Sequence, residues 1–498
     1  MSSVSASPVG PDLRGRDILA TWWPLAASWL LMGIEIPGIS AVVAHLPDAE
    51  RQLAAFGGIV FPLALLIESP IIMILAASTA MSRDLPSFLR LRRFMTQLAM
   101  GLTLIHMAVA FTPLYDLIAV RIIGAPDTII EPARTGLQVL SLWTWAIGDR
   151  RFHQGLLIRF GRQRTVSIGT MLRLVGTGIP LLVAFGLQRG FDSGVIGSTL
   201  RGLDLAFARD LSAAIAWADT AAIHGTMLAG IAMTCGVFVE ATYTRICAAE
   251  VRRGPLANAP LVSTDEERRL GAILGFYVPL AMTPLLALAT QPIGSAGMGR
   301  MPLTKISMAA WPMINGLGFM IRSVGVAYNE VVVRHAGEPG GERALRRFAT
   351  IGATGTLIAH ATLAFTPLGS WLFRGPGGLS PEIATVALEG FRWATPLPVV
   401  SWTLSLYTGL LVHARRTRGV TESVAIFLTV TSLTLVAGSW ADVMTGASVA
   451  VIAINLGAAA QCTWLVLRWR RVRAEREAAN AANAATVAVS TSPNGPAT

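Results

Sequence analysis

Lysine is nearly absent from this chain. Of its 498 residues, 40 are Lys or Arg, and Lys305 is the single lysine. The phosphate-binding motif of ATP-driven pumps needs a lysine directly after a glycine, whereas Lys305 follows a threonine. ATP-driven pumping by this chain is therefore excluded.

Cysteines and closely spaced metal ligands are also scarce. The three cysteines, Cys235, Cys247 and Cys462, show no CxxC spacing, and no HExxH motif occurs. Disulfide frameworks and zinc sites both need such patterns. We therefore expect no metal and no cofactor, and we expect that the chain is not an enzyme.

Charged residues are few and apolar residues abundant. They make up 14% and 53% of the chain, and the mean hydropathy is +0.57. A helix of about 20 apolar residues crosses the hydrocarbon core of a bilayer, and stretches of that length recur along the sequence. The pattern predicts an all-α polytopic membrane protein with 12 transmembrane helices. The expected spans are 18–46, 54–80, 94–118, 136–158, 165–187, 218–246, 271–295, 306–333, 348–373, 384–413, 420–440 and 443–467.

Basic residues are distributed unevenly between the loops that join these spans. Most of the 40 Lys and Arg fall in segments on the same side as both termini. Since basic residues are retained on the cytoplasmic side, we expect cytoplasmic N- and C-termini and a location in the cell's inner (plasma) membrane. The net charge of +11 then has a topological cause, so we expect no nucleic-acid partner. We expect a monomer surrounded by lipid bilayer.

One stretch of the sequence is written twice. The segments RRFMTQLAMGLTLIHMAVAFTPL (Arg92–Leu114) and RRFATIGATGTLIAHATLAFTPL (Arg346–Leu368) lie 254 residues apart and are identical at 12 of 23 positions. The same offset relates Glu68 to Arg322, and an offset of 255 relates the first helix of each half. Because each half has six helices, an even number, both halves begin on the same side of the membrane. The two repeats must therefore be parallel.

The repeat divides the chain into two lobes. We expect a cytoplasmic tail at 1–17, an N-lobe at 18–246, a cytoplasmic linker at 247–270, a C-lobe at 271–470 and a disordered tail at 471–498. Facing bundles related by an axis along the membrane normal are typical of transporters that alternate access to a site near the midplane. An inert duplicated scaffold is the alternative.

Several charged residues fall inside the expected spans. Each costs roughly 2.5 to 3.5 kcal/mol at a helix centre unless it finds a partner or water. They are Glu35, Glu68, Asp149, Arg150, Arg151, Arg173, Glu240, Arg322, Glu389 and Arg392. From the acids of the first lobe we expect coupling to H⁺ or Na⁺, at Glu35, Glu68 and Asp149. From the mixed set we expect substrate contacts, at Glu68, Asp149, Arg150, Arg151, His153, Arg322 and Arg392.

Three of these positions have specific interpretations. Glu35 precedes Pro37 by two residues. Because Pro37 lacks an N–H and its ring crowds a carbonyl of the preceding turn, free carbonyl oxygens lie next to the carboxylate, and together they would form a proton or Na⁺ site. The alternative is that the Glu35 side chain extends to the membrane interface. Glu68 and Arg322 occupy equivalent positions in the two repeats. We interpret them as pairing across a central cavity in at least one state; separate packing of each in its own bundle is the alternative.

The stretch WTWAIGDRRFHQG (Trp143–Gly155) is the densest polar cluster within a span. Asp149 and His153 are four residues apart and share one helix face, while Arg150 falls on the face of Gln154. The cluster is either an anion-binding and proton-linked site or an internal salt-bridge network that fixes helix packing.

Four stretches carry a resemblance to a known family. They are WWPLAASWLLMGIEIPG, AFGGIVFPLALLIESP, LSLWTWAIGDRRFHQGLLIRFGRQ and FRWATPLPVVSWTLSLYTGLL. Together with the twelve spans and the acids in the first lobe, they resemble the multidrug and toxic compound extrusion (MATE) fold. This fold belongs to the MOP superfamily, which also contains polysaccharide and lipid flippases. Within it, the chain looks most like the progressive ankylosis protein group.

The resemblance covers about residues 18–471 and implies a secondary exporter. It implies small anions such as pyrophosphate, citrate or nucleotides as substrates of the ankylosis group, and cationic drugs for the multidrug group. The intramembrane arginines favour anions, although Arg150 and Arg151 are more basic than that family pattern. We expect a secondary active exporter of a small organic or inorganic anion, coupled to H⁺ or Na⁺ and working by alternating access. A multidrug or organic cation antiporter is the first alternative, and a lipid-linked oligosaccharide flippase is the second.

Overall fold

All regular secondary structure is helical in the computed structural model, which describes residues 13–193, 223–266, 268–416 and 418–490. The all-α prediction is confirmed over these ranges. The first half contains α1 (Gly15–Ala44), α2 (Ala49–Ala55), α3 (Phe61–Glu68), α4 (Ile74–Met81), α5 (Leu85–Phe111), α6 (Leu114–Asp116), α7 (Asp127–Val139), α8 (Trp143–Arg159), α9 (Gln163–Asp192) and α12 (Gly225–Arg253). Short π or 3₁₀ turns join some of them: η1 (Phe56–Val60), η2 (Ser69–Ile71), η3 (Leu117–Ile123) and η4 (Leu140–Leu142).

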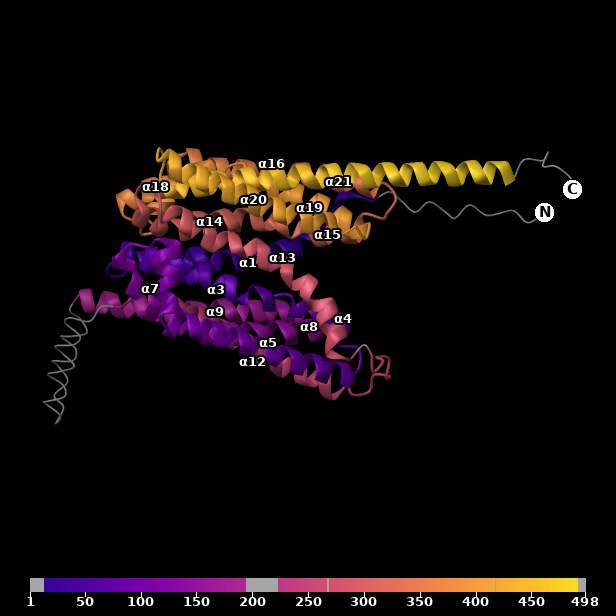
Figure 1. Ribbon diagram of the computed structural model, residues 1–498, viewed down its shortest axis with the longest axis horizontal. Helices are drawn as coiled ribbons and strands as arrows, with labels where there is room; N and C mark the ends of the chain where they lie inside the picture. The colour runs from indigo at the N-terminus through magenta and orange to yellow at the C-terminus, as the bar shows by residue number, and fades with distance from the viewer. Residues whose placement is uncertain (1–12, 194–222, 267, 417, 491–498) are drawn as a thin grey trace, which may run out of the picture.

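The second half is built in the same way. It contains α13 (Leu270–Met298), α14 (Thr304–Val326), α15 (Tyr328–His335), α16 (Gly341–Phe365), α17 (Pro367–Arg374), α18 (Pro381–Trp393), α19 (Leu397–His413), α20 (Arg418–Ala441) and α21 (Gly446–Ser490). Most helices of the first half form one bundle, and most helices of the second half form another beside it (Figure 1).

Nine described helices are long and apolar enough to cross a membrane, and the bent pair α18 and α19 makes a tenth. The two remaining expected spans, 136–158 and 306–333, are helical as well, as α8 and as α14 with α15. Helix α8 packs against α4, α5 and α12, and α14 packs against α1, α2 and α18. Because other helices surround them, these two helices hold polar residues that a lipid-facing span would exclude.

The first helix of each half crosses from one bundle to the other. The starting half of α1 packs on the second bundle, where the Trp22 indole N–H donates to the Val324 carbonyl at 2.8 Å. The starting half of α13 packs on the first bundle, where the Tyr277 hydroxyl donates to the Pro70 carbonyl at 2.5 Å. The far halves return to their own bundles, so the two crossing helices are related by the repeat.

Apart from the crossing helices, the described contacts between the bundles gather at the end away from the start of α1, where α14 packs on α2 and η1. There the Lys305 ammonium lies 3.0 Å from the Glu50 carboxylate. A Cβ atom on Gly57 would lie 2.1 Å from Pro312, so only glycine allows the two bundles to approach so closely. The bundles diverge toward the end where α1 begins and α21 ends (Figure 1).

Two of the predicted boundaries are wrong. Helix α21 continues to Ser490, so residues 471–490 are helical where we expected a disordered tail. The segment is rich in Ala, Glu and Arg, which have high helix propensity, and no proline or glycine interrupts it. Helix α12 likewise extends to Arg253, into the expected linker 247–270. Most of the predicted N-terminal tail, the start of span 218–246 and the last eight residues lie outside the described residues.

Candidate functional site

The candidate site begins with Glu35, on the far half of α1. Its carboxylate is buried and accepts a hydrogen bond from the guanidinium of Arg173 on α9. The Thr177 hydroxyl, one helical turn further along α9, donates to the other carboxylate oxygen at 3.0 Å. Glu35 therefore points into the first bundle, and the alternative in which it extends to the interface is wrong.

A second buried ion pair joins α8 to α12. Arg150 Nη1 donates to Glu240 Oε2 at 2.5 Å, and Gln154 Nε2 donates to Glu240 Oε1 at 2.8 Å. Arg150 and Gln154 are four residues apart, so the prediction that they share a helix face is confirmed. Glu240 is fully buried, and both of its oxygens are thus satisfied from one partner helix.

Glu68 lies between these two pairs, at the last residue of α3. Pro70 follows at the 3₁₀ turn η2, where the long helix from α2 to α4 is interrupted. The charges of Arg150, Arg151 and Arg173 all act on the Glu68 carboxylate. Within the described part of the chain, however, its Oε2 atom is buried without a hydrogen-bond partner.

Together these residues form the N-lobe charge cluster, defined as Glu35, Glu68, Glu240, Arg150, Arg151 and Arg173. Three glutamates balance three arginines, so the cluster is neutral when every group is ionised. The Nε atom of Arg151 is another buried polar atom that has no partner among the described residues. The Nε atoms of Arg150 and Arg173 are buried without a partner in the same way. Glu68 and Arg151 differ from the other four members because the described side-chain hydrogen bonds and ion pairs join Arg150 to Glu240 and Arg173 to Glu35 and include neither of them.

Asp149 and His153 lie beside this cluster on a neighbouring face of α8. Asp149 Oδ2 is 3.4 Å from His153 Nδ1, and Asp149 Oδ1 is 3.4 Å from Arg245 Nη2. The predicted shared face of Asp149 and His153 is confirmed. Since about half of the Arg245 side chain is exposed, this group has access to the surroundings that the charge cluster lacks.

The structure does not bring the two C-lobe arginines to the cluster. Arg322 Nη2 donates to Asn315 Oδ1 at 3.1 Å, on its own helix α14. The Arg392 side chain is exposed, and its Nε donates to the Ala364 carbonyl at 3.0 Å. The described ion pairs do not include one between Glu68 and Arg322, so that pairing stays a prediction for another conformation.

Arg173 and Glu240 are partners in the two buried ion pairs, yet from the sequence we assigned them no role beyond that of costly charges within spans. Each is the only acid or base that its helix contributes to the cluster. The one indication in the sequence was the free-energy cost of a charge inside a span. A lone charge on a buried helix needs a partner on another helix to offset that cost. The sequence does not reveal which helix supplies that partner.

Comparisons of sequence identify no relative of this chain. No protein-family model matches it, and no curated protein matches it.

Comparison of structures gives clear matches. A multidrug resistance MATE family transporter of the MOP superfamily, solved in an inward-facing conformation, is 16% identical, with a TM-score of 0.55, over 94% of this chain and 97% of that one. A eukaryotic MATE transporter is 13% identical, with a TM-score of 0.58, over 93% and 99% of the two chains. A MOP superfamily transporter from Pyrococcus furiosus is 15% identical, with a TM-score of 0.54, over 93% and 99%. The chain therefore has the MATE-like fold of a multi-pass membrane protein.

Proposed function

We propose that this chain is a secondary active transporter, not an enzyme, and that it exports a small organic or inorganic anion coupled to H⁺ or Na⁺ by alternating access. The observation that carries the proposal is the N-lobe charge cluster: six charged residues inside a two-bundle membrane fold, five of them buried and Arg151 half-buried. Such charges are costly in lipid and are retained where an ion or substrate passes. The similar fold of transporters solved in inward-facing and outward-facing conformations supports the two-state part of the proposal.

Glu68 is the coupling residue of the proposal. Glu35 and Glu240 already accept hydrogen bonds from arginine, whereas one oxygen of Glu68 has no partner among the described residues. When Glu68 takes up a proton or binds Na⁺, the balance of three acids and three arginines changes from zero to one positive charge. An anion beside Arg151 is then favoured, and by linkage a bound anion favours the cation at Glu68. Glu35 and Asp149 hold the flanking bases in place.

The arginines of the N-lobe charge cluster favour an anion over a cationic drug as the substrate. Arg150, Arg151 and Arg173 all lie in the cluster, and Arg322 extends the positive potential into the second bundle. The similar transporter from Pyrococcus furiosus is described as having a binding pocket of reverse polarity that suggests a different function. A change of pocket charge within this fold therefore has a parallel. The closer resemblance to the progressive ankylosis group is part of this proposal.

The proposed orientation places both termini in the cytoplasm of the inner membrane. The supporting observation is that most of the 40 Lys and Arg fall in segments on the same side of the expected spans as both termini. The described conformation is then inward-facing. We propose a monomer, since each chain contains both bundles.

Reconstituted liposomes provide the test. The purified protein should accumulate or release pyrophosphate, citrate or nucleotides under an imposed proton or Na⁺ gradient, and Glu68→Gln should abolish the coupling to the gradient. Accumulation of cationic dyes without anion flux would favour the antiporter alternative, and transfer of labelled lipid-linked oligosaccharide would favour a flippase. Failure to move any solute against its gradient would contradict secondary transport.

A further inference from the structure

Two stretches at the starts of α2 and α14 repeat each other with an offset of 255. They are LPDAERQLAAF (46–56) and MPLTKISMAAW (301–311). The residues directly before the two helices, Asp48 and Leu303, both have a backbone angle φ of +53°, which is uncommon outside glycine. The backbone thus supports the alignment, and Glu50 and Lys305 occupy equivalent positions.

The ion pair between Glu50 and Lys305 lies on the axis that relates the two halves. Lys305 Nζ is 3.0 Å from Glu50 Oε1. The offset of 255 also relates Gly57 to Pro312, and a Cβ atom on Gly57 would lie 2.1 Å from the Pro312 ring. A residue contacts its own twofold equivalent only next to the axis. We call these four residues the axial contact, where the two lobes meet along their axis.

Two further contacts flank the axial contact and are equivalent to each other. At the end of α1, the His45 ring lies so close to Gly378 that a Cβ atom there would be 2.4 Å away. At the end of α13, Arg300 lies against Gly124, where a Cβ atom would be 3.9 Å from its Nη1 atom. Both glycines have a positive φ, and the repeat relates His45 to Arg300 and Gly124 to Gly378. The lobes therefore close this end symmetrically.

The first half has one residue more than the second within the axial contact. The offset is 255 at Asp48 but 254 at Glu68, so the chain between them contains one residue that α14 lacks. The π turn η1 lies in this stretch and accommodates the extra residue, whereas α14 is a continuous helix. Since η1 packs on α14, the irregular turn is part of the interface between the lobes.

The ion pair of the axial contact differs from those of the N-lobe charge cluster. Among the ion pairs of the described residues, it alone joins the two halves of the chain. The side chains of Lys305 and Glu50 are 37% and 35% exposed, whereas both ion pairs of the cluster are buried. Water can replace an exposed partner, but breaking a buried pair leaves a charge in the interior. The pair between the lobes is therefore the one that can open.

Lysine suits a contact that forms and breaks. Every other basic residue among the 40 is arginine. An arginine guanidinium is a rigid fork that favours one pairing geometry, whereas a lysine ammonium is a compact charge on a flexible stem. The single lysine thus attracts Glu50 without fixing one arrangement of the lobes.

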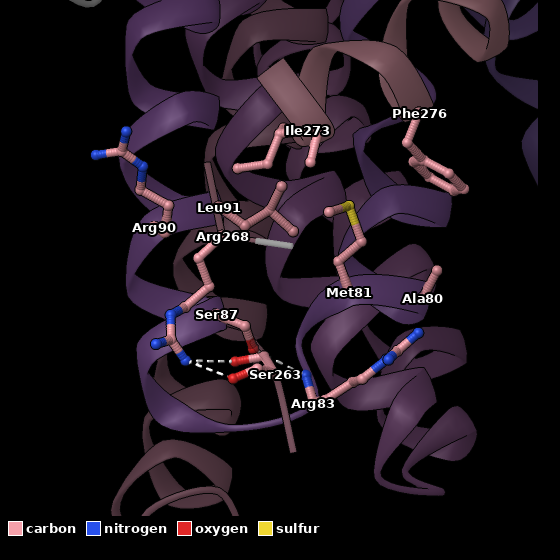
Figure 2. A pocket seen from close by; sticks show the side chains of 11 residues that line it. Ala80, Met81, Arg83, Ser87, Arg90, Leu91, Ser263, Arg268, Ile273 and Phe276 are labelled. Carbon is pink, nitrogen blue, oxygen red and sulfur yellow. Dashed lines mark hydrogen bonds between the residues drawn. The ribbon is translucent and has the colours of Figure 1, made fainter. Parts of the chain in front are cut away.

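The segment before α13 is fixed to the first bundle at the opposite end of the molecule. The N–H groups of Val262 and Ser263 donate to the Asp84 carboxylate at 3.0 and 2.7 Å. Arg268 Nη1 donates to the Ser263 carbonyl at 2.7 Å, beside the start of α5 (Figure 2). Burial alone would raise the pKa of Asp84, but its hydrogen bonds hold the pKa well below the usual range. This anchor stays ionised at neutral pH, and separation at the axial contact leaves it intact.

We propose that the axial contact is a gate and that the Glu50–Lys305 ion pair is its latch. The pair holds the lobes together at this end and breaks when the protein opens there, while α2 bends at the π turn η1. The inference rests on the proposed function, because alternating access requires opening at both ends. In the proposed orientation, this gate faces the outside.

The test measures the separation of the lobes at this end by double electron–electron resonance in detergent. Spin labels at Thr128→Cys and Glu382→Cys, exposed positions in the first turns of α7 and α18, report on the two bundles (Figure 1). Serine first replaces the native cysteines Cys235, Cys247 and Cys462. The measurement needs neither substrate nor gradient.

Lys305→Gln should raise the ratio of the longer to the shorter distance by up to about fivefold, the most that an exposed ion pair contributes. The swap Glu50→Lys/Lys305→Glu restores the attraction and should return the ratio to that of the parent protein. The matched control Glu250→Gln breaks an exposed ion pair with Arg162 inside the first bundle and should leave the ratio unchanged.

Gly57→Ala tests the packing of the gate while the ion pair remains. The added Cβ atom displaces Pro312, so the ratio should rise here as well. The matched control is Gly101→Ala on α5, where a Cβ atom has no packing neighbour within 4 Å. Circular dichroism of each variant distinguishes an opened gate from a lost fold.

Three outcomes would overturn the proposal: an unchanged ratio in Lys305→Gln and Gly57→Ala, an equal rise in Glu250→Gln, or no recovery in the swap. The distances also separate the gate from the proposed function. Anion transport with unchanged distances would contradict the gate alone. The expected distances in a protein that moves no solute would contradict the transport proposal alone.

Discussion

The interiors of the two bundles differ most at the positions that the repeat makes equivalent. Where α8 carries Asp149 and Arg150, α19 carries Thr403 and Leu404. Next to them, Gly148 of α8 corresponds to Trp402, which is almost fully buried and packs 5.0 Å from the ring centroid of Tyr328. At these equivalent positions, the first bundle has a buried ion pair and the second has aromatic packing.

This difference indicates which residues serve packing and which serve transport. Aromatic packing stabilises without any ionisable group, through large buried area and favourable ring geometry. Buried ion pairs stabilise little relative to apolar packing, because desolvation offsets much of the Coulomb attraction. The positions equivalent to Glu35, Arg150 and Arg173 carry Thr290, Leu404 and Phe427 in the second half. We infer that the first bundle keeps its charges for a reason other than stability.

The largest expected effect comes from giving α8 the residue that α19 carries. Arg150→Leu leaves Glu240 buried without its charged partner, and breaking such a pair costs about 3 to 5 kcal/mol. The melting temperature in detergent should fall accordingly. Arg150→Leu/Glu240→Leu removes both charges and should recover most of the loss. A single variant as stable as the parent protein would mean that the pair is not buried.

A smaller effect is expected at Asp84, the residue before α5. Its carboxylate accepts hydrogen bonds from the backbone N–H groups of Val262 and Ser263, in the segment between α12 and α13. Asp84→Asn weakens hydrogen bonds to a charged acceptor and should cost about 1.5 to 3 kcal/mol. Because the pKa is lowered on folding, the contribution of Asp84 is present above about pH 4 and is lost as the pH falls through the lower folded value. In thermal melts, the difference between protein and variant should therefore be full at pH 7 and should shrink progressively as the pH falls below about 4. A constant difference would contradict the ionised state.

The substitution Asp149→Thr, again toward the second bundle, should cost only about 1 kcal/mol. Its partner Arg245 is half exposed, so water replaces part of the lost interaction. Transport and stability should separate here: a strong loss of flux with little change in melting temperature is expected. A large drop in melting temperature with normal flux would assign Asp149 to packing.

The smallest effect on stability is expected from Arg322→Gln, since the described contacts of the guanidinium are one hydrogen bond to Asn315 and a cation–π contact with the Phe319 ring. One neutral partner is worth about 0.5 to 1.5 kcal/mol. The swap Glu68→Arg/Arg322→Glu tests their predicted pairing in another conformation. Loss of transport in both single variants without recovery in the swap would count against it.

The sequence predicted local relationships better than distant ones. The shared faces of Asp149 with His153 and of Arg150 with Gln154 follow from helix periodicity, which acts over four residues. The partners across the bundle lie much further away: Glu240 is 90 residues from Arg150, and Arg173 is 138 residues from Glu35. Such pairs depend on which helices pack together.

The sequence predicted that the first helices of the two halves, α1 and α13, are equivalent. It did not predict that each of them crosses to the other bundle. The repeat identified α1 and α13 as the first helices of the two halves. A hydropathy pattern, however, shows only that a helix is apolar enough to be buried, and it does not show which bundle the helix contacts. Trp22 and Tyr277 show which bundle each helix contacts through single hydrogen bonds to backbone carbonyls. Because every residue has a backbone carbonyl, the sequence does not indicate which carbonyl accepts such a hydrogen bond.

The most direct test of Glu68 as the coupling residue is the pH dependence of anion binding. Thermal stabilisation by pyrophosphate or citrate should be measured from pH 5 to pH 8 for the protein, for Glu68→Gln and for the matched control Glu382→Gln, which changes an exposed glutamate in the first turn of α18. A neutral cluster becomes positive when Glu68 is protonated, so stabilisation should grow as the pH falls in the protein and in the control. In Glu68→Gln it should be strong and independent of pH. An unchanged pH dependence in Glu68→Gln, or stabilisation by cationic dyes but not by anions, would contradict proton-linked anion binding at the N-lobe charge cluster.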